Sequence, residues 1–437
     1  MRLFGTSEGR GLGRRPAIVS VLDIGSAKVC CLVARLTPAA PGEAFRGRTH
    51  TIEILGIGHQ RSRGVKSGVI ANLDAAELAV RTTVDAAERK AGVTIESLIV
   101  SVSAGRLASE TCTASVALNG AAITEKDIGR VLAAGRHHTV TEGRSVVHSL
   151  PIGYSIDGEG GIADPRGMLG TRLGVDMHVV TADQPPLRNI ELAINRCHLS
   201  VQAMVAAPYA SGLSSLVDDE AELGCALVDF GGGTTTISVF NRGEFVHADA
   251  IAVGGHHITN DIARGLSTRI EEAERIKTMY GSALPGISDD REVISVPAIG
   301  EEDEHAGPNQ VPRSQLTRII RPRVEEILEL VRDRLNASGF ANLFGRRLVL
   351  TGGGSQLTGL NEAARRILAR NVRMGRPLGV AGMPEVARGP AFAAAVGLLI
   401  YPQVAEIEQV DDRHTHIAMT GTGGFASRVT RWFKESF

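Results

Sequence analysis

Three glycine-rich turns contain the residues of this chain whose types and spacing could perform chemistry. They are Asp23-Ile24-Gly25-Ser26, Asp229-Phe230-Gly231-Gly232-Gly233-Thr234 and Thr351-Gly352-Gly353-Gly354-Ser355, and each follows an apolar run typical of a β-strand. A phosphate chain needs backbone N–H donors close to it, and glycine allows both the close approach and a positive φ. The turns therefore predict a site for a phosphorylated ligand, and the third turn would let a base or ribose lie against bare backbone.

Polar side chains at the first two turns could complete such a site. Ser26, Thr234 and Thr235 offer hydroxyl donors, and Lys28 offers a cation. Asp23 and Asp229 are candidates to hold Mg²⁺ through its waters, since Mg²⁺ usually takes only one or two carboxylates. One such turn alone is weak evidence for a phosphate site, because most turns of this kind are ordinary tight turns. The chain has neither a Walker A motif nor a Rossmann fingerprint after a strand. The three turns together are much more specific.

The elements that must position these turns suggest a duplicated α/β chain. Residues 17–36 and 225–240 both follow the pattern of a strand, an Asp-x-Gly turn and a second strand. Residues 281–314 are expected to form a loop, and Pro322 is expected to kink or restart its helix. Periodicity predicts helices at about 72–91, 125–134, 187–196 and 315–335, and strands at 98–104, 177–181 and 348–350.

Composition excludes several classes of protein. The 437 residues are 43% apolar and 22% charged, as in ordinary globular proteins, and predict two to four domains. The formal charge of −1 gives no overall positive field for nucleic acid, so no nucleic-acid partner is expected. No apolar stretch is long enough to span a bilayer, and residues 1–16 lack the apolar core of a signal peptide. The five cysteines form no C-x-x-C pair, which indicates reduced thiols without a zinc cluster.

In this order, the three turns resemble the nucleotide site of the actin and DnaK-type chaperone superfamily of ATP-binding proteins. Residues 23–28 resemble its first phosphate loop, 229–234 its second and 350–357 its adenosine loop. Glu274 and Lys277 resemble the residues that flank the ribose and adenine. The resemblance implies ATP and Mg²⁺ as cofactors, and an actin-like fold of two duplicated RNase H-like α/β domains, each with an inserted subdomain.

The match is closer still to the bacterial cell-division family FtsA. It rests on residues 62–68, 273–281, 321–323 and 432–437, and the resemblance runs from about residue 17 to the end. It implies a filament on the inner face of the cytoplasmic membrane at the division site. Such a filament would attach peripherally, tether filaments of the tubulin-like protein FtsZ and recruit later division proteins.

The resemblance also assigns expected domain boundaries along the chain. Residues 205–213 and 390–400 resemble the two connecting helices that act as a hinge. The expected parts are a basic flexible N-terminus (1–16), a first actin-like domain (17–96 and 172–206) with an FtsA-type insert (97–171), a second actin-like domain (207–262 and 346–401) with an insert for the FtsZ tail (263–345), a polar linker (402–424) and a C-terminal amphipathic helix (425–437).

One departure from the superfamily pattern bears on hydrolysis. Actin-like and chaperone ATPases place a Gln or Glu before the residue that aligns with Pro208, where it orients the attacking water. This chain has Ala207, which cannot position water. Nucleotide binding with slow or negligible hydrolysis is therefore expected, so that the chain is at most a weak ATPase, unless another carboxylate substitutes in three dimensions.

The last residues have the pattern of an amphipathic helix. Their apolar side chains fall on one arc of a helical wheel, and the basic side chains lie outside it. Trp432 is the sole tryptophan, and such a ring suits a lipid headgroup layer. Binding to anionic inner-membrane lipids is predicted, with docking on the protein itself or on a partner as the alternative. The membrane candidates are Phe425, Arg428, Val429, Arg431, Trp432, Phe433 and Lys434.

Two further interpretations concern partners and rival functions. Arg318, Arg321 and Arg323 could receive an acidic peptide, although their spacing alone favours a solvated helix face. The resemblance implies that this subdomain takes the C-terminal tail of FtsZ, and it favours Arg323 among the three. One rival reading is a phosphotransferase of the same superfamily, such as a sugar or acetate-type kinase. Another is a pilus-assembly relative of FtsA, which would not be expected to carry the terminal membrane helix.

Overall fold

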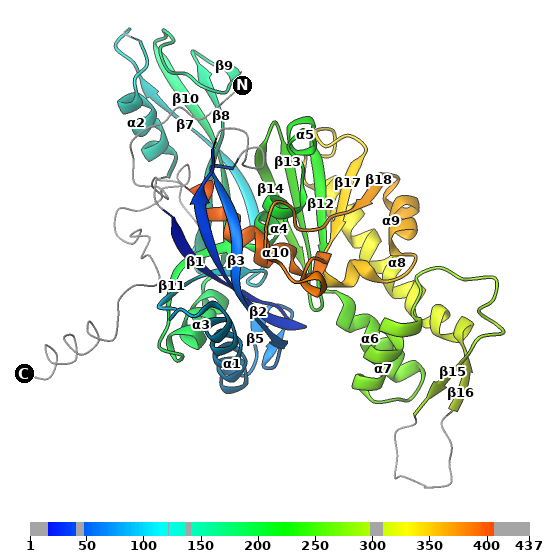
Figure 1. The fold of residues 1–437 in the computed structure, drawn as a ribbon. Coiled ribbons are helices and arrows are strands. Elements are labelled where there is room, and N and C mark those ends of the chain that lie inside the picture. Colours follow the sequence, from blue (N-terminus) through cyan, green and yellow to red (C-terminus); the bar gives the residue numbers. More distant parts are fainter. Residues whose placement is uncertain (1–15, 41–47, 121, 137–140, 298–308, 406–437) are drawn as a thin grey trace, which may run out of the picture.

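The computed structural model describes residues 16–40, 48–120, 122–136, 141–297 and 309–405, which form two α/β halves with one insert each (Figure 1). The expected N-terminal segment, almost all of the linker and the helix over 425–437 lie outside the described residues, and so do all seven membrane candidates.

The two halves contain five-stranded sheets of identical topology. Each begins with three antiparallel strands, and the first strand then pairs in parallel with a fourth, which pairs with a fifth. The first half consists of β1 (Ala17–Ile24), β2 (Lys28–Pro38), β3 (His50–Arg61), β4 (Val65–Lys66), β5 (Val69–Ile70), α1 (Leu73–Ala91), β6 (Ser97–Val102), α3 (Gln184–Asn195) and β11 (Ser200–Ala206). The second consists of α5 (Asp218–Leu223), β12 (Cys225–Phe230), β13 (Thr235–Asn241), β14 (Glu244–Ile251), β17 (Arg347–Thr351), α9 (Leu360–Leu368) and β18 (Asn371–Met374).

The duplication extends to single residues. Asp23 on β1 pairs with Cys30 on β2, and Asp229 on β12 pairs with Thr236 on β13, so each aspartate stands at the same register before its turn. The predicted pair of strand–turn–strand units is therefore confirmed, and with it the actin-like arrangement of two related halves.

The first insert forms a separate four-stranded sheet with one helix. It consists of β7 (Ala108–Ala117), α2 (Glu125–Arg136), β8 (Arg144–Ile156), β9 (Glu159–Ile162) and β10 (Arg172–Asp183). The expected limits of 97–171 are wrong at both ends. Residues 97–102 pair with β1 and β11 of the first half, whereas β10 pairs with β7 and β8 of the insert. Sequence pattern identified these strands but not their hydrogen-bonding partners.

The second insert is mainly helical and lies at the opposite end of the molecule from the first (Figure 1). It consists of α6 (Gly255–Gly265), α7 (Ile270–Tyr280), β15 (Val293–Val296), β16 (Asn309–Pro312) and α8 (Arg313–Ala337). The expected boundary after residue 262 cuts through α6. The expected loop over 281–314 contains the antiparallel pair β15–β16. Pro322 lies inside α8 and does not restart it, because the helix continues on both sides.

Two helices connect the halves and cross in the middle of the molecule. They are α4 (Ala207–Ser215) and α10 (Ala393–Ile400), and they lie close to the predicted connecting segments. A Cβ on Gly397 of α10 would lie 1.7 Å from the carbonyl oxygen of Ala210 on α4, so only glycine allows this approach. Residues of both helices share one apolar cluster with strands of both sheets, including Val21 and Leu227.

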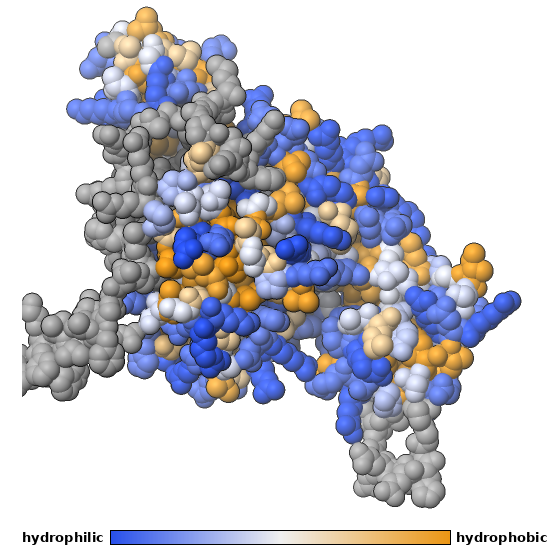
Figure 2. All heavy atoms as spheres, in the orientation of Figure 1, coloured by the Kyte–Doolittle hydropathy of each residue, from blue (hydrophilic) through white to orange (hydrophobic). Residues whose placement is uncertain are grey.

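Hydrophilic residues cover most of the face seen in Figure 2, with hydrophobic ones gathered over the strands of the first half.

In the described part of the chain, no helix combines the length and the apolar character that crossing a bilayer requires.

Candidate nucleotide site

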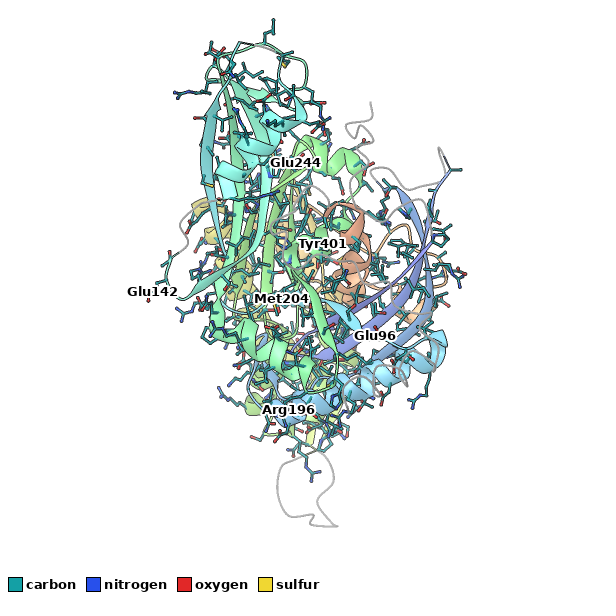
Figure 3. All side chains as sticks on the ribbon, turned by 90° about the vertical axis from the view of Figure 1, so that its left-hand side faces the viewer. Glu96, Glu142, Arg196, Met204, Glu244 and Tyr401 are labelled. Atoms are coloured by element: carbon teal, nitrogen blue, oxygen red, sulfur yellow. The ribbon has the colours of Figure 1, made fainter. Side chains whose placement is uncertain are left out.

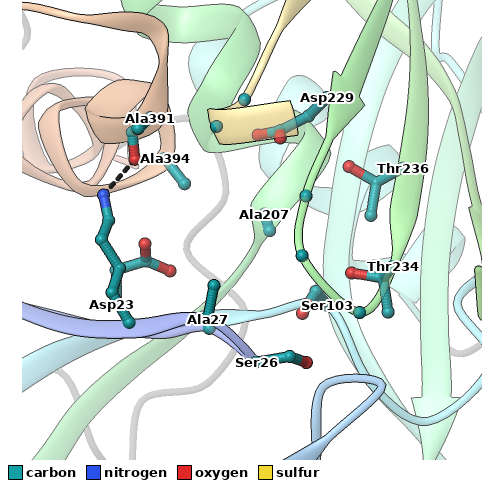
Figure 4. Close-up of a pocket in the computed structure, with 17 residues that line it drawn as sticks. Asp23, Ser26, Ala27, Ser103, Ala207, Asp229, Thr234, Thr236, Ala391 and Ala394 are labelled. Carbon is teal, nitrogen blue, oxygen red and sulfur yellow. Dashed lines mark hydrogen bonds between the residues drawn. The ribbon is translucent and has the colours of Figure 1, made fainter. Parts of the chain in front are cut away.

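A cavity between the two halves is lined by residues of all three glycine turns (Figure 4). The starts of α4 and α10 complete its wall through Ala207 and Ala394. The predicted residues that line it are Asp23, Gly25, Ser26, Lys28, Asp229, Gly231, Gly232, Gly233, Thr234, Gly352 and Gly353. Turns far apart in the sequence meet here because equivalent strands of the two sheets end at the same cleft.

The two aspartates project into the cavity from opposite sides (Figure 4). The Ser101 hydroxyl donates to Asp23 Oδ1 at 2.6 Å, and the Ser211 hydroxyl donates to Asp229 Oδ2 at 2.5 Å. Burial raises the pKa of Asp229 to about 6, and the nearby Asp23 carboxylate acts in the same direction. Two facing carboxylates in a cleft rich in backbone donors fit Mg²⁺, which takes one or two carboxylates and keeps several waters.

Glycine is required where the turns approach each other. Gly352 has φ +86°, and a Cβ there would lie 2.2 Å from Asp229 Oδ1. Across the cleft, a Cβ on Gly233 would lie 2.4 Å from the Ser26 hydroxyl, and one on Gly232 would lie 2.8 Å from the Ala27 Cβ. The first and second turns therefore touch, and together they leave bare backbone facing the cavity.

Lys28 links the first turn to the start of the last connecting helix. Its Nζ donates to the carbonyl oxygen of Ala391 and lies 3.6 Å from the centre of the Phe392 ring. Lys28 belongs to the first half, and its ammonium group lies against the start of the helix that connects the halves. A phosphate that attracted this ammonium group would therefore act on both halves.

Thr235 was predicted to face the ligand, and the structure contradicts this. Its hydroxyl donates to the Val253 carbonyl oxygen at 2.8 Å, on the other side of β13. Thr236 lines the cavity instead, and its buried hydroxyl has no hydrogen-bond partner within the described structure. Side chains alternate along a strand, and cross-strand partners share a face. Asp229 and Thr236 are cross-strand partners, so both face the cavity, and this pairing is known from the tertiary structure alone.

Three other predicted residues do not line the cavity. A Cβ on Gly354 would lie 2.4 Å from the Phe230 ring, so this glycine is needed for packing. Lys277 Nζ bonds to Glu274 Oε2 at 2.7 Å and to the Gly255 carbonyl oxygen at 3.1 Å, while the Gly255 N–H donates to the Gly231 carbonyl oxygen. Lys277 and its partner Glu274 are thus linked to the second turn through Gly255, and their contact with a nucleotide stays a prediction.

The three arginines predicted to bind a partner lie on α8 and differ in what they contact. Arg323 bonds to both carboxylate oxygens of Asp261, at 2.6 and 3.2 Å, and Arg321 bonds to Glu325 at 2.9 Å. Arg318 is exposed, and its guanidinium bonds to oxygen atoms of Ser314 one turn earlier. Arg318 is therefore the arginine best placed to meet another molecule.

Comparisons with known proteins follow the same division of the chain. A family model described as "Cell division protein FtsA" matches residues 226–397, and one described as "SHS2 domain inserted in FTSA" matches residues 104–181. The second range agrees with the insert strands β7 to β10.

Relatives match over nearly the whole length. Cell division protein FtsA of Rhizobium meliloti (strain 1021) is 60% identical, and the match covers 100% of both chains. The protein of the same description from Escherichia coli (strain K12) is 31% identical, over 96% of this chain and 98% of the other.

Solved structures support the fold. The PilM-PilN type IV pilus biogenesis complex is similar with a TM-score of 0.59 and 16% identity, over 89% of this chain and 98% of that one. MreB5 of Spiroplasma citri bound to ADP gives a TM-score of 0.51 and 15% identity, over 90% and 99%. At these identities the structures show a shared fold alone. The sequence identities show more: this chain belongs to the cell division protein family FtsA.

Proposed function

We propose that this chain binds Mg-ATP in the cleft and forms filaments on the inner face of the cytoplasmic membrane at the division site. There it would tether FtsZ filaments and recruit later division proteins. The observation that supports nucleotide binding best is the matched pair Asp23 and Asp229, each ahead of a glycine turn that lines the same cavity. Membership of the FtsA family supports the role in division.

Different residues of the cleft would bind the phosphates, the Mg²⁺ ion and the nucleoside. Backbone N–H groups of the first and second turns would bind phosphate oxygens, and Lys28 would add a positive charge. Asp23 and Asp229 would orient the waters of Mg²⁺, which supplies charge neutralisation for the phosphates. Gly352 and Gly353 would leave room for the nucleoside. Because both halves contribute, bound nucleotide would favour a closed cleft over an open one.

Hydrolysis is expected to be slow. Ala207 lies in the cavity wall, where a glutamine or glutamate would have to orient water. Among the described residues that line the cavity, Asp23 and Asp229 are the sole carboxylates, and both accept hydroxyl hydrogen bonds. Their positions support a nucleotide that sets the arrangement of the two halves and is hydrolysed only slowly.

A nucleotide titration tests the first part of the proposal. Purified chain is titrated with a fluorescent ATP analogue, with Mg²⁺ and with EDTA, while phosphate release is followed in parallel. Saturable binding that weakens in EDTA, with little phosphate released, is expected. Transfer of the γ-phosphate to a small acceptor at enzyme-like rates would instead support the phosphotransferase reading.

Recruitment of FtsZ tests the second part. We expect the acidic tail of FtsZ to meet α8 at Arg318, and the terminal helix over 425–437 to hold the complex on anionic lipid. Vesicles co-sedimented with the chain should bring down FtsZ, and Arg318→Glu should reduce FtsZ while the chain itself stays bound. Arg332→Glu, on the same helix and paired with the adjacent Asp333, is the matched control. Equal loss of FtsZ in both variants would contradict the assignment of Arg318.

A further inference from the structure

Two buried histidines of the first insert contact the parts of the molecule that surround the nucleotide cleft. His148 lies on β8 and is 1% exposed, and His178 lies on β10 and is 0% exposed. Neither lines the cavity, and the proposed function does not use them. Their contacts reach outside the insert in two different directions.

His148 connects the insert to both connecting helices. Its Nε2 accepts a hydrogen bond from the backbone N–H of Ala206 at 2.9 Å, immediately before α4 begins. Its ring packs edge-on against Tyr209 of α4, with ring centres 5.1 Å apart, and against Tyr401 after α10, at 5.8 Å. Figure 3 shows Tyr401 in the middle of the molecule. Ala207 lines the cleft, so the hydrogen bond from Ala206 and the Tyr209 ring contact place His148 directly against the start of α4.

His178 connects the insert to the sheet edge of the second half. Burial lowers its pKa to about 3, so the ring is neutral near pH 7. Nδ1 bonds to the Phe245 carbonyl oxygen on β14 at 2.7 Å, and Nε2 bonds to the Ser109 hydroxyl on β7. The Ser109 oxygen also accepts the Ala248 N–H at 2.9 Å. All polar atoms of this joint are paired, which makes an alternative arrangement costly.

Apolar side chains of the first insert also pack on both halves. Leu150 and Val180 of the insert belong to one cluster with Val205 of the first half and Phe245 and Ala248 of the second. The insert is thus continuous in sequence with the first half, yet it packs on both. A change in the angle between the halves cannot leave it in place, because close-packed interfaces switch between discrete arrangements rather than stretch.

We propose that the first insert moves in response to nucleotide binding in the cleft. His148 transmits movement of the start of α4 to β8, and the contact of His178 and Ser109 with β14 is the pivot, the fixed point about which the insert turns. The inference rests on the proposed nucleotide site, because Mg-ATP is the ligand expected to move α4. It makes His148 a positioning residue that acts through Ala206, with no contact to the nucleotide.

Hydrogen exchange on the full chain tests the transmission step. In the unmodified chain, Mg-ATP should slow amide exchange in the first turn of α4 and along β8. His148→Phe keeps a ring beside Tyr209 and Tyr401 but loses the acceptor. It should still bind Mg-ATP and protect α4, while β8 no longer responds. His148→Gln keeps an acceptor without the ring and should restore part of the response. A full response of β8 in His148→Phe would overturn the proposal.

A second experiment needs no nucleotide. Ser109→Ala removes both hydrogen bonds of the Ser109 hydroxyl at the pivot, which lies two ring contacts from α4: His178 packs on Phe245 at 4.9 Å, and Phe245 stacks on Tyr209 at 4.6 Å. Exchange in the first turn of α4 should become at least about fivefold faster, the factor expected for the loss of one hydrogen bond. Thr113→Ala, on the same strand, removes a hydrogen bond to Asp176 within the insert and should leave α4 unchanged.

The outcomes separate the two proposals. If Ser109→Ala leaves α4 exchange unchanged, the coupling is wrong whatever the nucleotide does. If Mg-ATP does not bind while Ser109→Ala does loosen α4, the proposed function fails and the coupling stands.

Discussion

At the scale of single residues, the Gly352 backbone and the Asp229 carboxylate occupy neighbouring space. Gly352→Ala would place a Cβ 2.2 Å from Asp229 Oδ1 and force alanine to φ +86°. With ψ at 161°, this backbone conformation is essentially restricted to glycine and costs another residue roughly 1–3 kcal/mol, and the displaced carboxylate would no longer face Mg²⁺. We expect Mg-ATP affinity to fall by about tenfold or more in a fluorescence titration. Gly389→Ala is the control, because this glycine does not line the cavity and its Cβ would meet only Gln356 Oε1 at 3.7 Å. Equal affinities in the two variants would contradict this geometry.

The raised pKa of Asp229 predicts a pH dependence of stability. Burial raises the pKa from 3.8 to about 6, so between those values the folded chain binds more protons than the unfolded chain. Without nucleotide, the free energy of unfolding should therefore fall as pH rises through this window, by up to about 3 kcal/mol at 1.36 kcal/mol per pKa unit. Mg²⁺ favours the carboxylate, so Mg-ATP should raise the melting temperature more at about pH 7 than at about pH 5.

Asp229→Asn provides the control for that prediction. The asparagine does not titrate, and the fall in stability between about pH 4 and about pH 6 should largely disappear. Thermal melts of both proteins across this range measure the difference. The same slope in both proteins would show that another group causes it.

At the scale of elements, the crossing of α4 and α10 depends on Gly397. Gly397→Ala would put a methyl group 1.7 Å from the Ala210 carbonyl oxygen, so the helices must separate. Overpacking of a core typically costs about 1–3 kcal/mol, and two rigid backbones place this case at the upper end. Melting should shift down by several degrees. Gly129→Ala in α2 is the matched helical control, with no atom within 4 Å, and should be neutral or slightly stabilising. An unchanged melting temperature for Gly397→Ala would contradict the close crossing.

Helices and strands were predicted most accurately where the signal comes from residues close together in the sequence. Helix α1 begins after Asn72, whose side chain accepts the Ala75 N–H, and it ends at Gly92 with φ +67°, which are both standard signals. The assignment of strands to sheets failed for residues 97–102 and 172–183, because pairing depends on partners distant in sequence. The short pair β15–β16 escaped notice because each strand has only four residues.

At the scale of the whole molecule, membrane attachment is predicted to depend on assembly. Trp432 is the sole tryptophan, so its emission reports insertion of the terminal helix. A blue shift on titration with anionic vesicles is expected, at lower lipid when Mg-ATP is present, because a filament presents many helices at once. Gly352→Ala should keep the shift but lose the effect of Mg-ATP. No shift at any lipid concentration would remove the membrane proposal.

The sequence by itself determined the duplicated strand–turn–strand units, the three glycine turns and the aspartates ahead of them, because these features depend on local periodicity and on backbone freedom. Tertiary structure alone decided that Thr236 rather than Thr235 faces the cavity, that Ser101 and Ser211 hold the aspartates, and that the first insert packs on both halves. Each of these depends on which face of a strand meets which neighbour, and that is fixed only when segments far apart in the chain pack together.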